Sequence, residues 1–332
     1  MIAEVGILGT GLYAPERVRD NVEIEAEFGL DAGWIESKVG VLERRAVATG
    51  EATSDLAVGA AADALWRAKV RPAEIGLIVV ATSTPDLPVS STAAIVQGRI
   101  GAGDAGAIDV NGACAGFVYA LTMAAGLLAI RGDDMKALVI GAETMSSILD
   151  TSDRATAVLF GDGAGAAVLG KVEKPYGILG YDLRADGRAW DLVHMPCGGS
   201  RRPSTHETVD DHGHVLKMNG RGVASFFAER TPAGLEQVAA SCGLGLDEVD
   251  VLVPHQANGV LLRQCLGEAG FGDDRVCYTL DRFGNTGSAS VAITLADADR
   301  GGRFSDGDLV MLFGIGAGMT WGGLVTRWQN AS

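Results

Sequence analysis

The chain has 332 residues, of which 47% are hydrophobic and 21% charged, and its formal net charge is −15 at pH 7. This length suits two domains or one large two-part unit, and the composition permits a sizeable core and disfavours disorder. The acidic balance argues against nucleic acid and anionic membranes as partners, and it makes binding of any acidic ligand depend on local basic residues.

The five cysteines are odd in number and show no paired spacing. This argues against a disulfide framework and a zinc site, and favours a reducing, cytoplasmic location. We expect no apolar run to reach the roughly 18 residues that a membrane span needs. The first residues carry neither the basic region nor the cleavage site of a signal peptide and are predicted to form a strand. We therefore expect a cytoplasmic protein that does not enter a membrane.

The hydrophobic pattern of the first half predicts alternating strands and helices. Strands are expected at residues 2–8, 75–82, 107–110 and 137–143, and helices at 21–28, 54–68, 92–100 and 117–130. Residues 54 and 55 are a plausible cap for the second helix. The strand at 75–82 is apolar on both faces, which is typical of a parallel sheet covered on both sides. Residues 155–169 are predicted to be two strands joined by a glycine-rich turn.

The second half repeats this order. Residues 74–80 resemble 248–254, residues 109–121 resemble 281–295 as strand, turn and helix, and residues 138–142 resemble 310–314. The three matches share a shift of roughly 172–174 positions, which indicates a domain-sized duplication. We expect two α/β halves, residues 1–172 and 173–332, whose strand-end loops converge on one crevice.

Cys114 lies in the sequence Asp109-Val-Asn-Gly-Ala-Cys-Ala-Gly-Phe117, between a short strand and a long apolar helix. A helix N-terminus presents unpaired N–H groups and a partial positive charge, which favour a thiolate and lower a cysteine pKa. The small neighbours let a substrate carbonyl approach the Cys114 N–H, which could hold an oxyanion. The pattern predicts a nucleophile, and the alternative is a small buried core thiol.

Two residues of the second half are candidate partners for Cys114. His255 follows a fully apolar strand, and Asn285 lies in a glycine turn that mirrors the Cys114 turn. Alone, His255 is a strand-end residue and Asn285 a turn former. Their repeat-related positions predict that Cys114, His255 and Asn285 together form one site.

Residues 184–217 contain His194, His206, His212 and His214 near Cys197. A metal site is one interpretation of this cluster. The spacings fit no common zinc pattern, and the neighbouring acidic residues are typical of a solvated loop. We expect no metal here.

The run Gly161-x-Gly163-x-Gly165 permits a second interpretation, as a nucleotide-binding loop. The residues after it favour a strand instead of a helix, and no suitably placed acidic residue follows. A structural turn is therefore preferred to a nicotinamide site.

Taken together, the motifs resemble those of a known family. They are the Cys114 stretch, Phe160-Gly-Asp-Gly-Ala-Gly-Ala, Val253-Pro-His-Gln-Ala-Asn, Gly284-Asn-Thr-Gly-Ser-Ala-Ser and Met319-Thr-Trp-Gly. In this order they resemble β-ketoacyl-acyl-carrier-protein synthase III, an acyltransferase family with the α/β thiolase-like fold, over nearly the whole chain. The resemblance implies a homodimer, a five-layer αβαβα core, and no metal or redox cofactor.

The resemblance also implies a reaction. Cys114 takes an acyl group from acyl-CoA, and His255 and Asn285 then donate hydrogen bonds to a malonyl thioester carried on acyl carrier protein. The enolate formed by decarboxylation attacks the acyl group, giving a 3-oxoacyl product of fatty-acid initiation or a polyketide starter unit. The implied oxyanion hole consists of backbone N–H groups at Cys114, Gly316 and Ala317.

Binding residues follow from the same resemblance. The implied contacts to CoA and its pantetheine arm are Trp34, Lys38, Arg154, Met218, Gly220 and Asn258. Leu87 and Ala224 stand where the family often has larger aromatic residues, which predicts a roomier acyl pocket for branched or longer starters. Val260 stands where the family often has an arginine for carrier-protein docking, and Arg263 lies one helical turn away.

Alternative functions stay open at this point. The main one is a non-condensing acyltransferase that passes the acyl group to an oxygen or nitrogen nucleophile of a small molecule. Another is a non-catalytic partner subunit, which the retained Cys114 disfavours. A thiolase is disfavoured because residues 314–319 lack its second cysteine.

Overall fold

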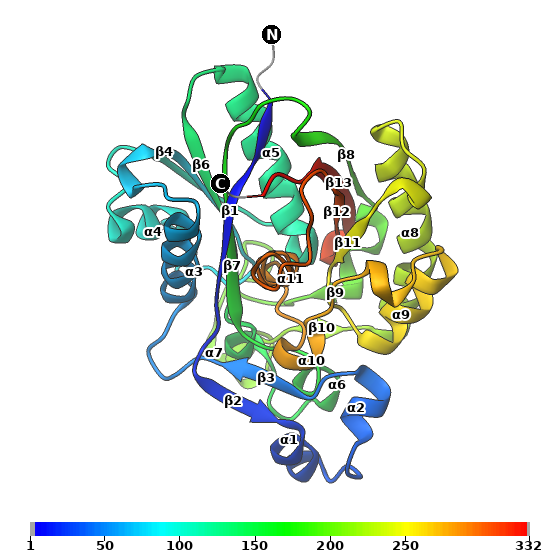
Figure 1. The fold of residues 1–332 in the computed structure, drawn as a ribbon. Helices are drawn as coiled ribbons and strands as arrows, with labels where there is room; N and C mark the ends of the chain where they lie inside the picture. Colours follow the sequence, from blue (N-terminus) through cyan, green and yellow to red (C-terminus); the bar gives the residue numbers. More distant parts are fainter. Residues whose placement is uncertain (1–3, 331–332) are drawn as a thin grey trace.

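Two mixed β-sheets organise the molecule in the computed structural model, which describes residues 4–330 (Figure 1). The first sheet has the order β1 (Val5–Tyr13), β7 (Gly163–Lys171), β6 (Lys136–Glu143), β4 (Ile75–Ala81) and β5 (Gly106–Val110). The second has the order β11 (Val251–Pro254), β12 (Leu309–Gly316), β13 (Thr320–Arg327) and β8 (Gly177–Ala185). Of the strand predicted at residues 2–8, Ile2 and Ala3 lie outside the described residues.

The two sheets share one pairing pattern. In the first, β4 and β6 are parallel, and β6–β7 and β7–β1 are antiparallel. In the second, β11 and β12 are parallel, and β12–β13 and β13–β8 are antiparallel. The segments paired by sequence, 74–80 with 248–254 and 138–142 with 310–314, thus occupy equivalent strands. The predicted boundary at residue 172 falls between β7 and β8.

The helices and strands pack in five layers, and three apolar clusters fill the space between these layers. Between the sheets lie α5 (Gly116–Arg131) and α11 (Ala289–Arg300), which bury Phe117 and Val291 in a shared core. The outer face of the first sheet is covered by α3 (Thr53–Arg67) and α4 (Thr92–Ile100), and that of the second by α8 (Gly220–Ser241) and α9 (Gly259–Glu268). This helix–sheet–helix–sheet–helix arrangement is the predicted α/β thiolase-like fold.

Strand β4 shows why its sequence is apolar throughout. Ile78 and Val80 pack toward the outer helices, whereas Val79 and Ala81 pack toward the central layer. Alternate side chains of a strand point to opposite faces, so a sheet covered on both sides needs apolar residues at every position.

The central helix was predicted to within one residue at each end, but the expectation that no apolar run reaches the length of a membrane span was wrong at this helix. By length and composition alone, the stretch Ala113–Arg131 could cross a membrane, because it has 19 residues and a mean hydropathy of 2.0. Its 16-residue helical part lies between the two sheets, where Phe117, Leu121 and Leu128 are buried. This packing is that of a core helix in a soluble protein.

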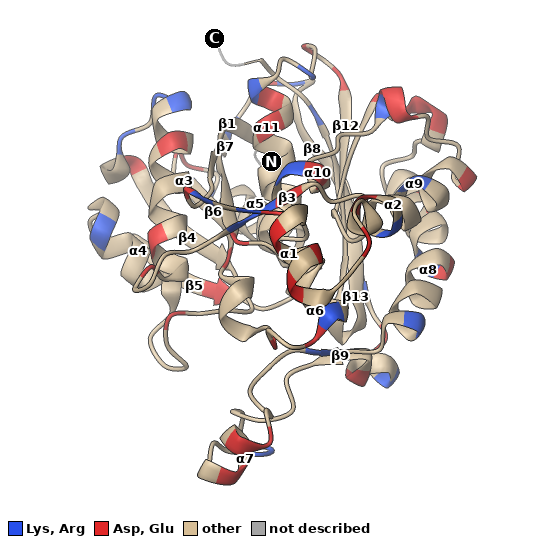
Figure 2. Ribbon diagram, turned by 90° about the horizontal axis from the view of Figure 1, so that it is seen from below, with Lys and Arg blue, Asp and Glu red and all other residues tan. Residues whose placement is uncertain are grey.

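The remaining elements surround the lower half of the molecule in Figure 1. They are β2 (Arg17–Asp20), β3 (Glu43–Ala46), α1 (Asn21–Phe28), α2 (Trp34–Val39), α6 (Arg154–Ala157), α10 (Leu280–Phe283), and the excursion of β9 (Val193–His194), α7 (His206–Asp210) and β10 (Lys217–Met218). Figure 2 shows α7 projecting from the body, with charged residues concentrated on the outer helices and loops.

Two local predictions were wrong, and a third was half right. Residues 154–157 form a helix, α6, because the Asp153 carboxylate accepts a hydrogen bond from Ala155 N at 2.9 Å and caps it; only one strand, β7, follows. Residues 280–283 form α10 instead of the strand expected from the repeat. Of the predicted cap of α3, Asp55 is confirmed, because its carboxylate accepts from Ala52 N at 2.7 Å, whereas Ser54 lies inside the helix, which begins at Thr53.

Candidate active site

Cys114 lies in a tight turn, Ala113–Ala115, between β5 and α5. Ala113 has a φ of 46°, a left-handed conformation that few residues with a side chain adopt. Its N–H donates to Asn111 Oδ1 at 3.2 Å, which helps to hold the turn. The strained backbone directs the Cys114 side chain into a cavity at the junction of the two halves.

Strand β12 of the second half approaches the Cys114 turn through glycines. A Cβ atom on Gly316 would lie 2.5 Å from Cys114 N and 2.9 Å from Cys114 Cβ, and one on Gly314 would lie 2.8 Å from Ala115 Cα. Only glycine permits this approach of the two backbones. It brings the predicted oxyanion-hole segment, Gly316 and Ala317, to the edge of the cavity that Cys114 lines.

His255 follows β11 and is only 3% exposed. Its backbone N–H donates to Phe313 O at 2.8 Å. The buried side chain of Gln256 holds the turn in place, because it donates to Pro254 O at 2.9 Å and accepts from Thr279 N at 3.1 Å. Burial lowers the pKa of His255 to about 3, so the imidazole is neutral near pH 7.

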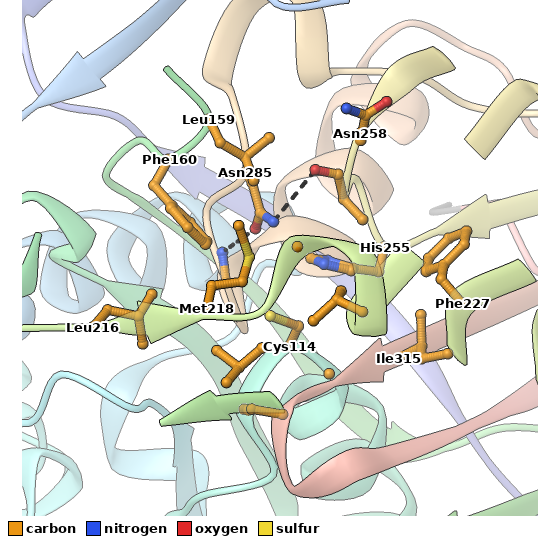
Figure 3. A pocket seen from close by; sticks show the side chains of 18 of the residues that line it. Cys114, Leu159, Phe160, Leu216, Met218, Phe227, His255, Asn258, Asn285 and Ile315 are labelled. Carbon is orange, nitrogen blue, oxygen red and sulfur yellow. Dashed lines mark hydrogen bonds between the residues drawn. The ribbon is translucent and has the colours of Figure 1, made fainter. Parts of the chain in front are cut away.

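Asn285 lies in the turn between α10 and α11, and its backbone is held at both ends. Asn285 N donates to Leu159 O at 2.9 Å, and Gly161 N donates to Asn285 O at 3.0 Å. The side-chain Oδ1 accepts from Gly287 N at 3.0 Å, which orients the carboxamide so that Nδ2 faces the cavity, 3.5 Å from Ala257 O (Figure 3).

In the resting protein, the side chain of Cys114 is a protonated thiol and not a thiolate. Burial, followed by the nearby Glu143 carboxylate, raises the pKa of Cys114 to about 12. The predicted lowering of this pKa was wrong in direction, because loss of solvation and the Glu143 charge outweigh the hydrogen bond from the Cys114 backbone. The resting pair is therefore a neutral thiol and a neutral imidazole.

Cys114, His255 and Asn285 all line one cavity of about 690 Å³ (Figure 3). One side chain comes from the first half and two come from the second, and each stands at the end of a strand or in the turn before a helix. Most of the remaining wall is apolar and includes Val158, Leu159, Phe160, Leu216, Phe227 and Ile315. An apolar lining of this kind suits an uncharged ligand, and the three polar side chains supply hydrogen-bonding and nucleophilic groups within it.

The predicted CoA-binding residues divide into two groups. Lys38, Met218, Gly220 and Asn258 line the cavity. Trp34 and Arg154 lie outside its lining and stack on each other instead, with the guanidinium carbon 5.3 Å from the ring centroid.

Asn258 has a structural role that the sequence analysis did not predict. Its Oδ1 accepts from Leu261 N at 3.0 Å and caps α9, and its Nδ2 donates to Lys38 O at 3.4 Å.

The two predicted acyl-pocket residues also differ. Ala224 lines the cavity, whereas Leu87 does not and is 51% exposed in the loop between β4 and α4. In the single chain, Leu87 therefore closes no pocket, because its loop runs over the surface.

Sequence analysis missed Glu143 and Ser83, which also line the cavity. Glu143 ends β6, and Ser83 follows β4. Polar residues at the carboxyl ends of neighbouring parallel strands meet at one edge of the sheet, and this signal was available in the sequence.

The histidine-rich excursion does not form a cluster of ligands. Among residues 4–330, no group of three His, Cys, Asp or Glu side chains is placed to hold a metal ion. His214 Nε2 pairs with Thr208 Oγ1 at 2.9 Å, and His194 Nδ1 lies 2.9 Å from Asp191 O.

A cysteine at the start of a buried helix, faced by histidine and asparagine from a second, topologically equivalent half, defines the class of thiolase-fold acyl-transfer enzymes. The family model described as 3-oxoacyl-[acyl-carrier-protein (ACP)] synthase III matches residues 108–187, and its C-terminal counterpart matches residues 239–328.

Individual proteins agree with these matches. The chain is 43% identical to a β-ketoacyl-[acyl-carrier-protein] synthase III of Caldanaerobacter subterraneus, over 98% of each chain. It is also 43% identical to the acetoacetyl CoA synthase NphT7 of a Streptomyces species, over 97% of this chain and 98% of that one. The solved structure of the priming β-ketosynthase from the R1128 polyketide pathway superimposes with a TM-score of 0.92 at 31% identity, covering 99% and 98% of the two chains. The chain belongs to the β-ketoacyl-acyl-carrier-protein synthase III family of condensing enzymes.

Proposed function

We propose that the protein is an acyl-CoA-primed condensing enzyme that joins the acyl group to a malonyl unit carried on acyl carrier protein. The observation that carries this proposal is the meeting of Cys114, His255 and a fixed Asn285 carboxamide in one cavity. Relatives that act in fatty-acid synthesis and in polyketide priming support it.

In the first half-reaction, the Cys114 sulfur attacks the thioester carbon of acyl-CoA. The carbonyl oxygen becomes an oxyanion, which the N–H groups of Cys114 and of the Gly316–Ala317 segment stabilise. Collapse breaks the bond to the CoA sulfur, and the thiol proton of Cys114 leaves with CoA. His255 does not accept that proton, because burial lowers its pKa to about 3 and keeps the imidazole neutral throughout the transfer.

In the second half-reaction, the malonyl thioester loses carbon dioxide and leaves an enolate. The negative charge develops on the thioester oxygen, where the N–H groups of His255 and Asn285 donate hydrogen bonds. One preorganised donor of this kind is typically worth about 3–4 kcal/mol. The enolate carbon then attacks the acyl group on Cys114, and expulsion of the Cys114 sulfur yields the 3-oxoacyl thioester.

The binding of CoA is proposed to use the cavity mouth. Lys38 lies at this mouth, and Trp34 and Arg154 stack nearby. A chain with a net charge of −15 repels phosphates in general, so these local cations and the Trp34 ring face supply the attraction for an anionic nucleotide. No metal or redox cofactor takes part in the proposed chemistry, and acyl-CoA is a substrate.

A homodimer is proposed from an apolar surface on the first half. Strand β5 is an edge strand, and helix α5 beside it exposes a row of apolar side chains. The exposed apolar residues of this region are Leu87, Val89, Ile108, Met123, Leu127 and Ile130, the last 83% exposed. Unpaired edge strands and contiguous apolar patches favour association. A cytoplasmic location is proposed because all five cysteines are free thiols.

The test is the release of carbon dioxide from malonyl-acyl carrier protein by the purified enzyme. We expect release to depend on acyl-CoA and to be lost in Cys114→Ala. An enzyme that loads Cys114 but passes the acyl group to an alcohol or amine without releasing carbon dioxide would instead be the non-condensing acyltransferase.

A further inference from the structure

Glu143 is a fully buried carboxylate at the end of β6 that lines the catalytic cavity. All of its hydrogen-bond partners are neutral N–H or O–H groups. Oε1 accepts from Ser83 N at 3.0 Å, Ser288 N at 3.3 Å and Ser288 Oγ at 2.8 Å, and Oε2 accepts from Thr84 Oγ1 at 2.6 Å and Thr82 Oγ1 at 3.4 Å. Removing a carboxylate from water costs much free energy, even when five donors satisfy its oxygens. Packing alone therefore does not explain why Glu143 is buried here.

The partners of Glu143 come from both halves of the molecule. The residues at 82–84 belong to the loop after β4, whereas Ser288 stands at the start of α11 in the second half. Ser288 Oγ also lies 2.7 Å from Ala81 O, so its single O–H proton is shared between this carbonyl oxygen and the Glu143 carboxylate. The Glu143–Ser288 contact is therefore a hydrogen-bonded link between the halves at the floor of the site.

This link adjoins both catalytic turns. Ser288 Cβ lies 3.5 Å from the position that a Cβ on Gly116 would occupy, two residues after Cys114. In the sequence, Ser288 follows Gly287. The Gly287 N–H donates to Asn285 Oδ1 and so orients that carboxamide. A Cβ on Gly287 would lie 3.0 Å from Glu143 Cγ, so Glu143 packs directly against the residue that holds Asn285.

We propose that Glu143 is a positioning residue for the condensation half-reaction, acting through Ser288 and Gly287 on the Asn285 carboxamide. This inference rests on the proposed function and adds a residue to its machinery. Acyl transfer to Cys114 does not use Asn285, so loss of Glu143 separates the two half-reactions. A misplacement of about 1 Å at a catalytic group can reduce a rate about a hundredfold, even when the substitution lies outside the reacting groups.

The experiment compares Glu143→Gln with Glu143→Leu. Glutamine keeps one oxygen that can accept from Ser83 and Ser288, whereas leucine has similar size and no acceptor. We expect neither variant to load an acyl group on Cys114 more slowly than the wild type, because removing the negative charge of Glu143 lowers the pKa of the Cys114 thiol. We expect the release of carbon dioxide from the malonyl thioester by the loaded enzyme to fall about tenfold to a hundredfold in the leucine variant, with glutamine in between.

Ser288→Ala provides a second variant that removes only one of the five donors. It should lower the release of carbon dioxide in the same direction by a smaller factor, again without slowing loading. Asp162→Asn is the matched control, because Asp162 is an equally buried carboxylate whose acceptor bonds go to Val47 N and to Ser146 N and Oγ, outside the cavity. The change in melting temperature of Asp162→Asn measures how much stability is lost when a buried carboxylate is removed outside the cavity.

Equal losses of loading and of carbon dioxide release in the leucine variant would overturn the proposal, as would wild-type release in that variant. Failure of the proposed function is a separate result, since the wild-type protein would then fail to load Cys114 or to release carbon dioxide at all.

Discussion

His255 allows a quantitative test of how deeply the site is buried. Its pKa is about 3 in the folded protein, against an ordinary value of 6.5. The folded state therefore binds this proton less tightly than the unfolded chain does. Between pH 6.5 and pH 3, the unfolded state carries the extra proton, so the free energy of unfolding falls as the pH falls through this range.

The size of the effect follows from the two pKa values. Each pH unit well inside the range is worth about 1.4 kcal/mol, so lowering the pH from 7.5 to 4.5 removes about 3 kcal/mol of stability through this group alone. Below about pH 3 the loss is complete. His255→Gln lacks the titrating group but keeps a neutral polar side chain of similar length, so this part of the acid destabilisation disappears.

The assay is urea denaturation of the wild type and of His255→Gln at pH 7.5 and pH 4.5. We expect the wild type to lose about 3 kcal/mol more than the variant on acidification. The packing cost of the substitution is present at both pH values and cancels. His206→Gln, on the exposed helix α7, corrects for removal of an imidazole as such. An equal loss in the wild type and His255→Gln would refute the conclusion that this imidazole is kept neutral by burial.

Three further predictions concern the site. Asn285→Ala should load Cys114 normally and lower carbon dioxide release about a hundredfold to a thousandfold, because one enolate donor is lost; an equal fall in loading would contradict its assignment to the second half-reaction. Trp34→Ala should raise the KM for acyl-CoA about tenfold with kcat little changed, since stacking of a base on an aromatic ring is worth about 1–3 kcal/mol; an unchanged KM would exclude Trp34 from the nucleotide site. Gly316→Ala should abolish loading and lower the melting temperature, because its Cβ would lie 2.5 Å from Cys114 N; an active, stable variant would show that the backbones need not approach so closely.

The element types of the first half could be predicted well from hydrophobic patterning. Strand β4 and helix α5 have strong patterns, because one is apolar on both faces and the other is a long apolar run covered by two sheets. The failures occurred where local hydrogen bonds decide the structure, as at the Asp153 cap of α6 and at α10. A repeat match predicts an equivalent place in the fold, but it does not guarantee equivalent local structure.

The candidate site was predictable as a set of residue positions but not as a set of electrostatic environments. Glycine turns before apolar helices indicated Cys114 and Asn285, and the repeat predicted that they meet in one crevice. The direction of the Cys114 pKa depends on burial and on Glu143, which reaches the site from a different strand. Neither quantity is visible in the residues around Cys114. The stacking of Trp34 on Arg154 likewise depends on how two distant segments pack.

The central claim is that Cys114 carries the acyl group. The most direct measurement is the mass of the intact protein after incubation with a panel of acyl-CoAs, followed by peptide mapping of the adduct. The account predicts one added acyl group per chain, located on Cys114 and absent in Cys114→Ala. A stoichiometric adduct on another residue, or an adduct that survives in Cys114→Ala, would contradict it.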